Sequence, residues 1–357
     1  MDLFVPGRIC LFGEHSDWAG GYRRLNPAIG KGYALIAGTE QGIHARVERH
    51  PEALVLTSIA EDGASRAPRT IPMDPGTLLR EAEQGGFWSY VAGVALEILP
   101  HRPTGGFVLD NHAMDLPLRK GLSSSAAICV LTARAFNRLY NLGLTRREEM
   151  ELAYQGEIRT PSRCGRMDQG CAFGRRPILM TFDGDAMDAS EIAITADLHL
   201  LIVDLQTRKD TRTILARLNR AFPLADDAIA RGVQELLGPI NARLVDRAVE
   251  ALGAGDARRL GLLMTQAQEH FDRLAAPACP EELTAPVLHR VLRHPPLQPH
   301  VWGGKGVGSQ GDGAAQFVAR SAADRDAAIA VIERDLGMPC LPLTLAAGLN
   351  AGVGGRA

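Results

Sequence analysis

Residues 121–127 read GLSSSAA and are followed at once by a segment with the apolar spacing of a helix. We predict this helix over about residues 123–141, where Asn-Leu-Gly ends it. A helix N-terminus has unpaired backbone N–H groups and a partial positive charge, glycine lets a ligand approach the backbone, and serine hydroxyls add donors. The stretch therefore predicts either a phosphate cradle or an N-cap with surplus serines, and these residues alone leave both open. It is not a GxxxxGK[ST] P-loop.

The composition indicates an ordinary globular protein of more than one domain. The chain has 357 residues, with 46% hydrophobic and 22% charged residues, and one core seldom serves such a length. A net charge of -2 argues against nucleic acid or an anionic membrane as a partner. We expect no membrane span and no signal peptide. The six cysteines form no CxxC pair and no zinc-ligand spacing, so we expect reduced thiols and a cytoplasmic protein.

The pattern along the chain mixes strands and helices. Thr145 and Glu148 have the spacing of a capping box at the start of a second helix. We predict an α/β (α+β) protein with an N-terminal domain at 1–190 and a C-terminal domain at 191–357. The expected elements are strands near 34–48, 105–114 and 199–205, a helix at 88–99, helices beyond 210, and a glycine-rich loop at 303–313 followed by a strand.

Two further stretches carry clustered polar residues. The segment PGRICLFGEHSDW brings Glu14, His15 and Asp17 into a turn-like setting, where they can hydrogen-bond several hydroxyls of a polyol. The alternative is a capped turn with solvated charges, which is the more common case. The segment PSRCGRMDQG places Asp168 between two glycines, and an aspartate there is either a turn-former or a catalytic group.

Five segments together resemble the GHMP kinase superfamily, above all its galactokinase branch and next its mevalonate kinase branch. The first three are PGRICLFGEHSD, the phosphate-loop segment LPLRKGLSSSAA, and CGRMDQ, which matches the segment with the catalytic aspartate. The others are FWSYVAGV and the glycine-rich GGKGVGSQGDGAAQFVA. They occur in the family's order from residue 6 to about residue 320. Each motif is weak alone, but five in order are specific.

The resemblance implies a fold, a reaction and a set of site residues. The fold would be the two-domain GHMP kinase fold, with an N-terminal domain like ribosomal protein S5 domain 2 and a ferredoxin-like C-terminal domain. The reaction would be transfer of the ATP γ-phosphoryl group, with Mg²⁺, to a hydroxyl of a monosaccharide or polyol. The implied catalytic residues are Asp168 and Arg8, and an Asp168 beside Arg8 should stay ionised. The implied substrate-binding residues are Glu14, His15, Asp17, Gly165 and Arg166. The implied ATP-binding residues are Lys120, Gly121, Leu122, Ser123, Ser124, Ser125, Ala126 and Trp88, where Trp88 either lies beside adenine or simply packs. The implied metal ligands are Glu157 and either Ser124 or Ser125.

The chain departs from galactokinases in ways that bear on the substrate. Trp18-Ala19 stands where galactokinases have Tyr-Asn, and QTRKDTRTILARLN lacks the tyrosine that they use near there. Arg166 replaces an apolar residue, which indicates either an acidic sugar or, as we prefer, a surface arginine. Gln310 and Asp312 interrupt the third motif. The alternatives kept open are a mevalonate-type kinase and a non-catalytic sugar- and ATP-binding regulator. We expect the protein to be a monomer or homodimer.

Overall fold

The computed structural model describes residues 1–59, 67–100, 105–116, 122–162 and 164–348. The chain forms two compact units, one of Met1–Arg8 with Gly38–Arg175 and the other of Ile9–Ala37 with Arg176–Ala357. We call them the N unit and the C unit. Strands β1 (Asp2–Phe12) and β2 (Gly32–His50) each run from one unit into the other. The domain division at residue 190 remains a sequence-based prediction.

The N unit contains a sheet in the order β4-β3-β5-β2, with β1 also paired to β2. Its other strands are β3 (Ala53–Ser58), β4 (Arg69–Pro72) and β5 (Gly106–Met114). Strands β3 and β5 are parallel, because helices are inserted between them, whereas β2 and β5 are antiparallel. The predicted strands near 34–48 form one continuous strand with a bulge after His44.

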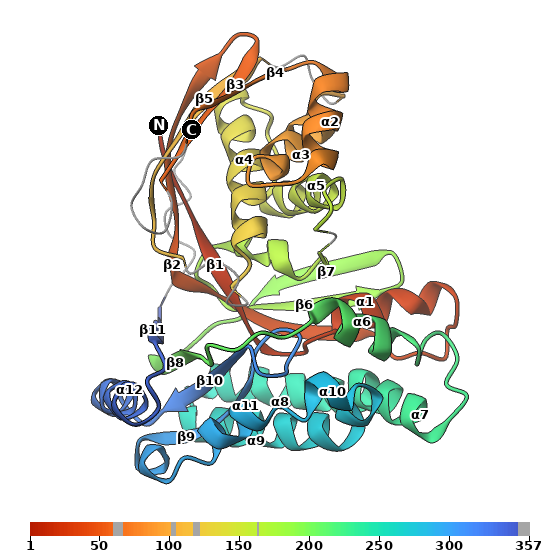
Figure 1. Cartoon of the computed structure of the whole chain (residues 1–357), viewed down its shortest axis with the longest axis vertical. Helices are drawn as coiled ribbons and strands as arrows, with labels where there is room; N and C mark the ends of the chain where they lie inside the picture. Colours follow the sequence, from red (N-terminus) through yellow and green to blue (C-terminus); the bar gives the residue numbers. More distant parts are fainter. Residues whose placement is uncertain (60–66, 101–104, 117–121, 163, 349–357) are drawn as a thin grey trace. The chain divides into compact units, whose positions relative to one another are not determined.

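Four helices lie beside this sheet (Figure 1): α2 (Pro75–Gln84), α3 (Ser89–Ile98), α4 (Ser124–Tyr140) and α5 (Arg146–Ile158). The last three confirm the sequence predictions, and the Thr145–Glu148 capping box of α5 is formed. Helices α3 and α5 approach closely at two glycines. A Cβ on Gly93 would lie 2.2 Å from the carbonyl oxygen of Gly156, so only glycine permits this packing. It positions the end of α5, which carries Glu157.

The C unit contains a four-stranded antiparallel sheet in the order β11-β8-β10-β9. Its strands are β8 (Leu198–Asp204), β9 (Val301–Gly306), β10 (Ala314–Ala319) and β11 (Cys340–Leu345). Strand β6 (Ile178–Asp183) pairs with the first residues of β2, and β7 (Ala186–Glu191) pairs with β6. The expected loop at 303–313 is wrong for its first residues, which belong to β9. A ladder needs only backbone groups, so a glycine-rich segment can pair with β10.

Helices cover the four-stranded sheet and build the core of the C unit (Figure 1). Helix α9 packs along β9, and α12 packs on β8 and β10. Leu201, Val203 and Phe317 are buried at the centre of this core. The helices of this unit are α1 (Ser16–Gly21), α6 (Thr211–Asn219), α7 (Ala228–Glu235), α8 (Asn241–Ala254), α9 (Ala257–Leu274), α10 (Pro280–Leu283), α11 (Pro286–Leu292) and α12 (Ala322–Leu336). No helix among the described residues is long and apolar enough to cross a bilayer.

Candidate functional site

Arg8 and Asp168 form an ion pair in the N unit. Nε of Arg8 lies 3.1 Å from Oδ1 of Asp168, and Nη2 donates to the same oxygen. The Arg8 side chain is 6% exposed and that of Asp168 22%. Both contacts go to Oδ1, so within the described chain Oδ2 of Asp168 receives no hydrogen bond. A carboxylate that is held by one oxygen and open at the other can accept a hydrogen bond from a hydroxyl.

The main chain of Arg8 also connects to the serine-rich stretch. Its N–H donates to the carbonyl oxygen of buried Leu122 at 3.0 Å. Two of the predicted nucleotide residues, Lys120 and Gly121, lie outside the described residues. Leu122 therefore anchors the described end of this stretch beside the residue that holds Asp168.

Helix α4 begins at Ser124 as the serine stretch ends. Ser123 occupies the N-cap with φ 57 and makes no capping hydrogen bond with its side chain. Capping accordingly does not account for that serine. Ser123, Ser124 and Ser125 keep partial exposure, whereas Ala126 is buried. The start of α4 thus presents hydroxyls and helix N–H groups, the donors that phosphate oxygens require.

Glu157 lies near the end of α5 and is 0% exposed. Its carboxylate accepts hydrogen bonds from Gln169 Nε2 at 2.7 Å and from Ser162 Oγ at 3.4 Å, and the nearby Ser125 hydroxyl acts to lower its pKa. Burial, and next the charge of Asp168, raise the pKa of Glu157. A cation between these two carboxylates would offset that penalty.

Three other predicted site residues of the N unit, Arg166, Gly165 and Trp88, contact neighbouring protein groups. Arg166 is 3.2 Å from Glu151 Oε1 and stacks over the Tyr154 ring, with 5.0 Å from its guanidinium carbon to the ring centroid. This geometry matches the surface-arginine interpretation. Gly165 accepts a hydrogen bond from the Asp168 N–H at 3.4 Å. Trp88 stands at the start of α3 and contacts Phe87 edge to face.

In the C unit, the turn after β1 carries the Glu14 cluster. Glu14 is 9% and His15 5% exposed, so the interpretation as a solvated turn is wrong for these two residues, while Asp17 keeps partial exposure. His15 has φ 68, a left-handed conformation that costs a non-glycine residue free energy and is concentrated at functional sites.

The His15 ring is neutral at ordinary pH. Burial above all, together with the charges of Lys209 and Lys305, lowers its pKa to about 4. Its Nδ1 accepts a hydrogen bond from Trp18 Nε1 at 3.2 Å. The Ser309 main chain lies against the ring, yet among the described residues Nε2 makes no hydrogen bond of ordinary geometry. A neutral ring with this tautomer has a spare N–H donor.

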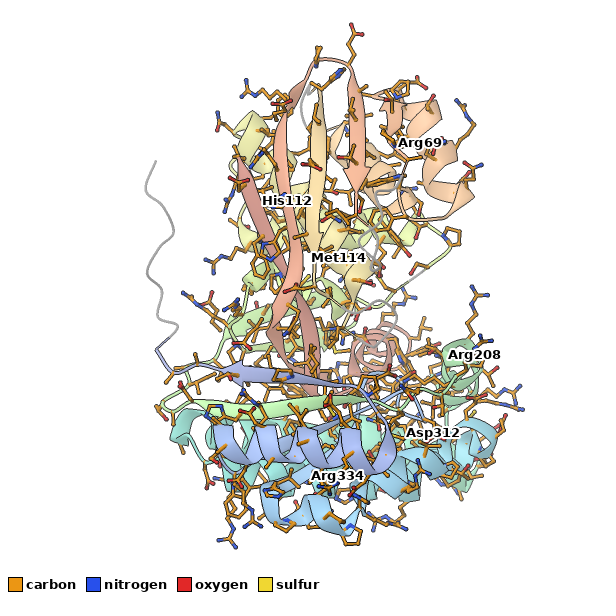
Figure 2. All side chains as sticks on the ribbon, turned by 60° about the vertical axis from the view of Figure 1, so that its left-hand side comes forward. Arg69, His112, Met114, Arg208, Asp312 and Arg334 are labelled. Atoms are coloured by element: carbon orange, nitrogen blue, oxygen red, sulfur yellow. The ribbon has the colours of Figure 1, made fainter. Side chains whose placement is uncertain are left out.

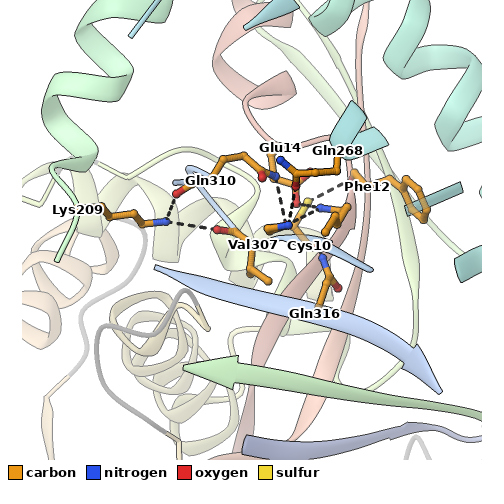
Figure 3. A network of polar contacts seen from close by, with 10 residues as sticks. Cys10, Phe12, Glu14, Lys209, Gln268, Val307, Gln310 and Gln316 are labelled. Carbon is orange, nitrogen blue, oxygen red and sulfur yellow. Dashed lines mark hydrogen bonds and ion pairs between the residues drawn. The ribbon is translucent and has the colours of Figure 1, made fainter. Parts of the chain in front are cut away.

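Glu14 forms a buried ion pair with Lys305, which is 1% exposed and also donates to the carbonyl of Gly306 at 3.0 Å (Figure 3). Gln310 lies beside this pair, and its Oε1 is buried without a partner among the described residues. These three side chains line a cavity of about 30 Å³ together with Asn241 and several apolar residues. The cavity has room for little more than a water molecule and is too small for a sugar.

Sequence reasoning missed the two lysines of this cluster. Lys209 precedes α6 and donates to the carbonyls of Gln310 at 2.6 Å and Val307 at 3.4 Å. Lys305 stands within the third glycine motif and pairs with a residue 291 positions away. The only available signal was a lysine among glycines, where a charged side chain is uncommon.

Comparisons with known proteins agree on one fold. Residues 89–175 match the model of the GHMP kinase N-terminal domain. The solved structure of Lactococcus lactis galactokinase complexed with galactose superposes with a TM-score of 0.71 at 20% identity, covering 96% of this chain and 92% of that one. Methanococcus jannaschii mevalonate kinase superposes with a TM-score of 0.68 at 17% identity, covering 96% and 97%. The fold is thus the two-domain α/β fold of these kinases, and residues 89–175 are similar to the GHMP kinase N-terminal domain.

The chain is also similar in sequence to galactokinases. The galactokinase of Thermococcus kodakarensis is 30% identical over 207 residues, which are 57% of this chain and 52% of that enzyme. The galactokinase of Thermotoga maritima is 23% identical over 308 residues, covering 79% of this chain and 80% of that enzyme. The alignment to the first of these relatives thus spans about half of its length.

Proposed function

We propose that the protein is an ATP-dependent kinase that phosphorylates a hydroxyl of a monosaccharide or a closely related polyol. The observation that carries this proposal is the double link made by Arg8, whose side chain holds Asp168 and whose main chain holds Leu122. One residue thus joins the candidate hydroxyl-orienting group to the candidate phosphate-binding stretch. Phosphoryl transfer depends mainly on such positioning and on stabilising charge at the phosphoryl oxygens.

In this proposal the N unit provides the chemistry. The Oδ2 atom of Asp168 accepts the hydrogen bond of the substrate hydroxyl, and Arg8 keeps that carboxylate in place. The serines at the start of α4 and its helix N–H groups bind ATP phosphates, together with Lys120, Gly121 and Leu122 as the resemblance implies. Trp88 either flanks adenine or only packs.

The same unit can hold the Mg²⁺ that such chemistry requires. Among the described residues no cluster of three or more His, Cys, Asp or Glu side chains is present. Mg²⁺ bound with a nucleotide needs fewer protein ligands, because phosphates and waters fill its octahedral shell. Buried Glu157 and the Ser125 hydroxyl, which acts on the pKa of that carboxyl, fit that demand, so we propose Ser125 rather than Ser124 as the metal-side serine. The ion would supply charge neutralisation at the phosphates.

The C unit provides the sugar-binding groups in this proposal. Glu14 and Asp17 offer acceptors and His15 a donor, a set that suits vicinal hydroxyls and rejects analogues that lack them. The galactokinase relatives support a sugar, whereas the mevalonate kinase likeness rests on fold alone. Action in the cytoplasm as a monomer or homodimer remains a prediction.

A substrate screen tests the proposal. ADP release is measured with ATP and Mg²⁺ across aldoses, amino sugars, uronic acids, polyols and mevalonate, with Asp168→Asn protein as the control for contaminating kinases. We expect turnover of at least one sugar by the native protein alone. Turnover of mevalonate with no sugar accepted would replace the sugar assignment. Binding of sugar and ATP without any turnover would identify a regulator.

A further inference from the structure

Lysine is rare in this chain, and its positions are therefore informative. Only four of the 39 Lys and Arg residues are lysines: Lys31, Lys120, Lys209 and Lys305. Arginine is the usual basic residue here, and it differs from lysine in its size, its fixed fork of donors and its permanent charge. Two of the four lysines, Lys209 and Lys305, lie in the C unit beside Glu14 and His15.

Lys209 is held by main-chain carbonyls and not by a carboxylate. Its ammonium donates to the carbonyls of Gln310 and Val307, and among the described residues it forms no ion pair. An ammonium has three protons, so one donor is left over, and the side chain keeps partial exposure. The end of the side chain also lies close to Gly313, where a Cβ would be 2.6 Å from the Lys209 Cε.

The charged groups that face Lys209 are engaged elsewhere. Glu14 is paired with Lys305, Asp312 Oδ1 accepts from the Leu288 N–H at 2.8 Å, and Glu282 Oε2 accepts from the Asp210 N–H at 3.0 Å. His15 is neutral. Arg208, the exposed neighbour of Lys209, and Asp312 lie at the same end of the C unit (Figure 2). Lys209 is therefore the positive charge of this cluster that lacks a carboxylate in contact.

Arg166, the other candidate for an acidic substrate group, is already occupied. It pairs with Glu151 and stacks on Tyr154. An arginine held in this way has little to gain from a second carboxylate.

We propose that Lys209 is a specificity-determining residue that binds a carboxylate on the sugar, so that the preferred substrate is a sugar acid. The proposal rests on the proposed kinase function and names the substrate class of the same site. Glu14, His15 and Asp17 still bind hydroxyls, and the third N–H of the Lys209 ammonium donates a hydrogen bond to the carboxylate. Charge-assisted hydrogen bonds of this kind are the strong ones.

The test compares hexuronates with their neutral parents. ADP release gives kcat/KM for D-galacturonate and D-galactose and for D-glucuronate and D-glucose, and the pair with the highest value is used. We expect native protein to prefer the acid by about 10-fold or more. Lys209→Met should remove that preference, mainly through KM of the acid, while Lys209→Arg should keep part of it. Lys31→Met, which loses an exposed lysine paired with Asp183, is the matched control and should retain the preference.

The pH dependence adds a readout that a structural role would not show. Burial is the main cause that lowers the Lys209 pKa, to about 8, while a hexuronate remains ionised throughout this range. The acid preference of the native protein should therefore fall between pH 7 and 9.5, and that of Lys209→Arg should not. Thermal melts of each variant confirm folding.

Each other outcome has a definite meaning. Equal losses for acid and neutral sugar in Lys209→Met would show that Lys209 only clamps the loop and would overturn the proposal. A native protein that prefers the neutral sugar would also overturn it, while leaving the kinase function intact. No turnover of any sugar would remove the proposed function itself.

Discussion

At the scale of single residues, the candidate site depends on a few charges that the fold holds in place. Arg8 and Asp168 are 160 positions apart in sequence, and their ion pair fixes one carboxylate oxygen and leaves the other for a ligand. In the C unit the Lys305 ammonium neutralises Glu14, while burial keeps His15 neutral. Each of these groups has a state that a single substitution can change.

Asp168→Asn should lower kcat by about 100-fold or more, because the substrate hydroxyl loses its anionic acceptor and Arg8 its charged partner. ATP affinity should stay close to native, since the phosphate-binding groups are unchanged. Steady-state kinetics and calorimetry with ATP measure the two quantities. Turnover close to native would remove Asp168 from the mechanism.

His15 should make the protein sensitive to acid. Its pKa is about 4 in the folded chain and 6.5 ordinarily, so between these values the unfolded chain binds the proton more readily. Stability conferred by the neutral ring is complete above pH 6.5 and is lost as pH falls to 4, by about 3 kcal/mol at roughly 1.4 kcal/mol per unit. Urea unfolding at several pH values should show this slope, and His15→Gln should flatten it. An unchanged slope would contradict the prediction.

At the scale of elements, the start of α4 and the end of α5 meet at one point. The Ser125 hydroxyl on α4 acts to lower the pKa of Glu157 on α5, and the Gly93–Gly156 approach holds α5 against α3. Ser124 is the neighbouring residue with the same hydroxyl. The structure thus distinguishes Ser125 from Ser124, which the sequence alone does not.

Ser125→Ala should raise the Mg²⁺ concentration needed for half-maximal activity by about 10-fold, because a hydroxyl beside Glu157 is lost. Ser124→Ala is the matched control and should change it much less. The measurement is ADP release at fixed ATP and varied Mg²⁺. A larger effect for Ser124→Ala would reverse the assignment.

At the scale of the whole molecule, each unit has its own core and its own group of candidate site residues. The N unit contains the residues proposed to bind phosphate and metal, and the C unit contains those proposed to bind hydroxyls, together with Lys209 and Lys305. The buried Glu14–Lys305 pair ties the turn after β1 to β9 within the C unit. The stability of that unit therefore depends on an ion pair inside its candidate site.

Lys305→Met should destabilise the protein by about 3–5 kcal/mol, because it leaves Glu14 buried without its partner charge. Adding Glu14→Gln should recover part of this loss, because no charge is then left uncompensated. Urea unfolding followed by tryptophan fluorescence measures both, with Trp18 and Trp302 in the C unit and Trp88 in the N unit. If the double variant is no more stable than Lys305→Met alone, the unpaired charge of Glu14 is not the cause of the lost stability.

The sequence by itself indicated the resemblance to GHMP kinases, the mixed α/β fold and the order of the motifs. Capping and apolar spacing are local properties, so the helices at α3, α4 and α5 were predictable. Strand β1 was not, because it is buried along nearly its whole length and shows no alternation. Strand β9 was predicted as a loop, because its glycines have no side chains whose pattern would indicate backbone pairing.

Only the tertiary structure decided which charges meet. It paired Glu14 with Lys305, 291 positions apart, left Lys209 with carbonyl partners, and placed Arg166 on Glu151 and Tyr154. Residue types and spacing define what a side chain can bind. Burial and the identity of its neighbours decide whether its charge is compensated, and contacts between segments distant in the chain set both.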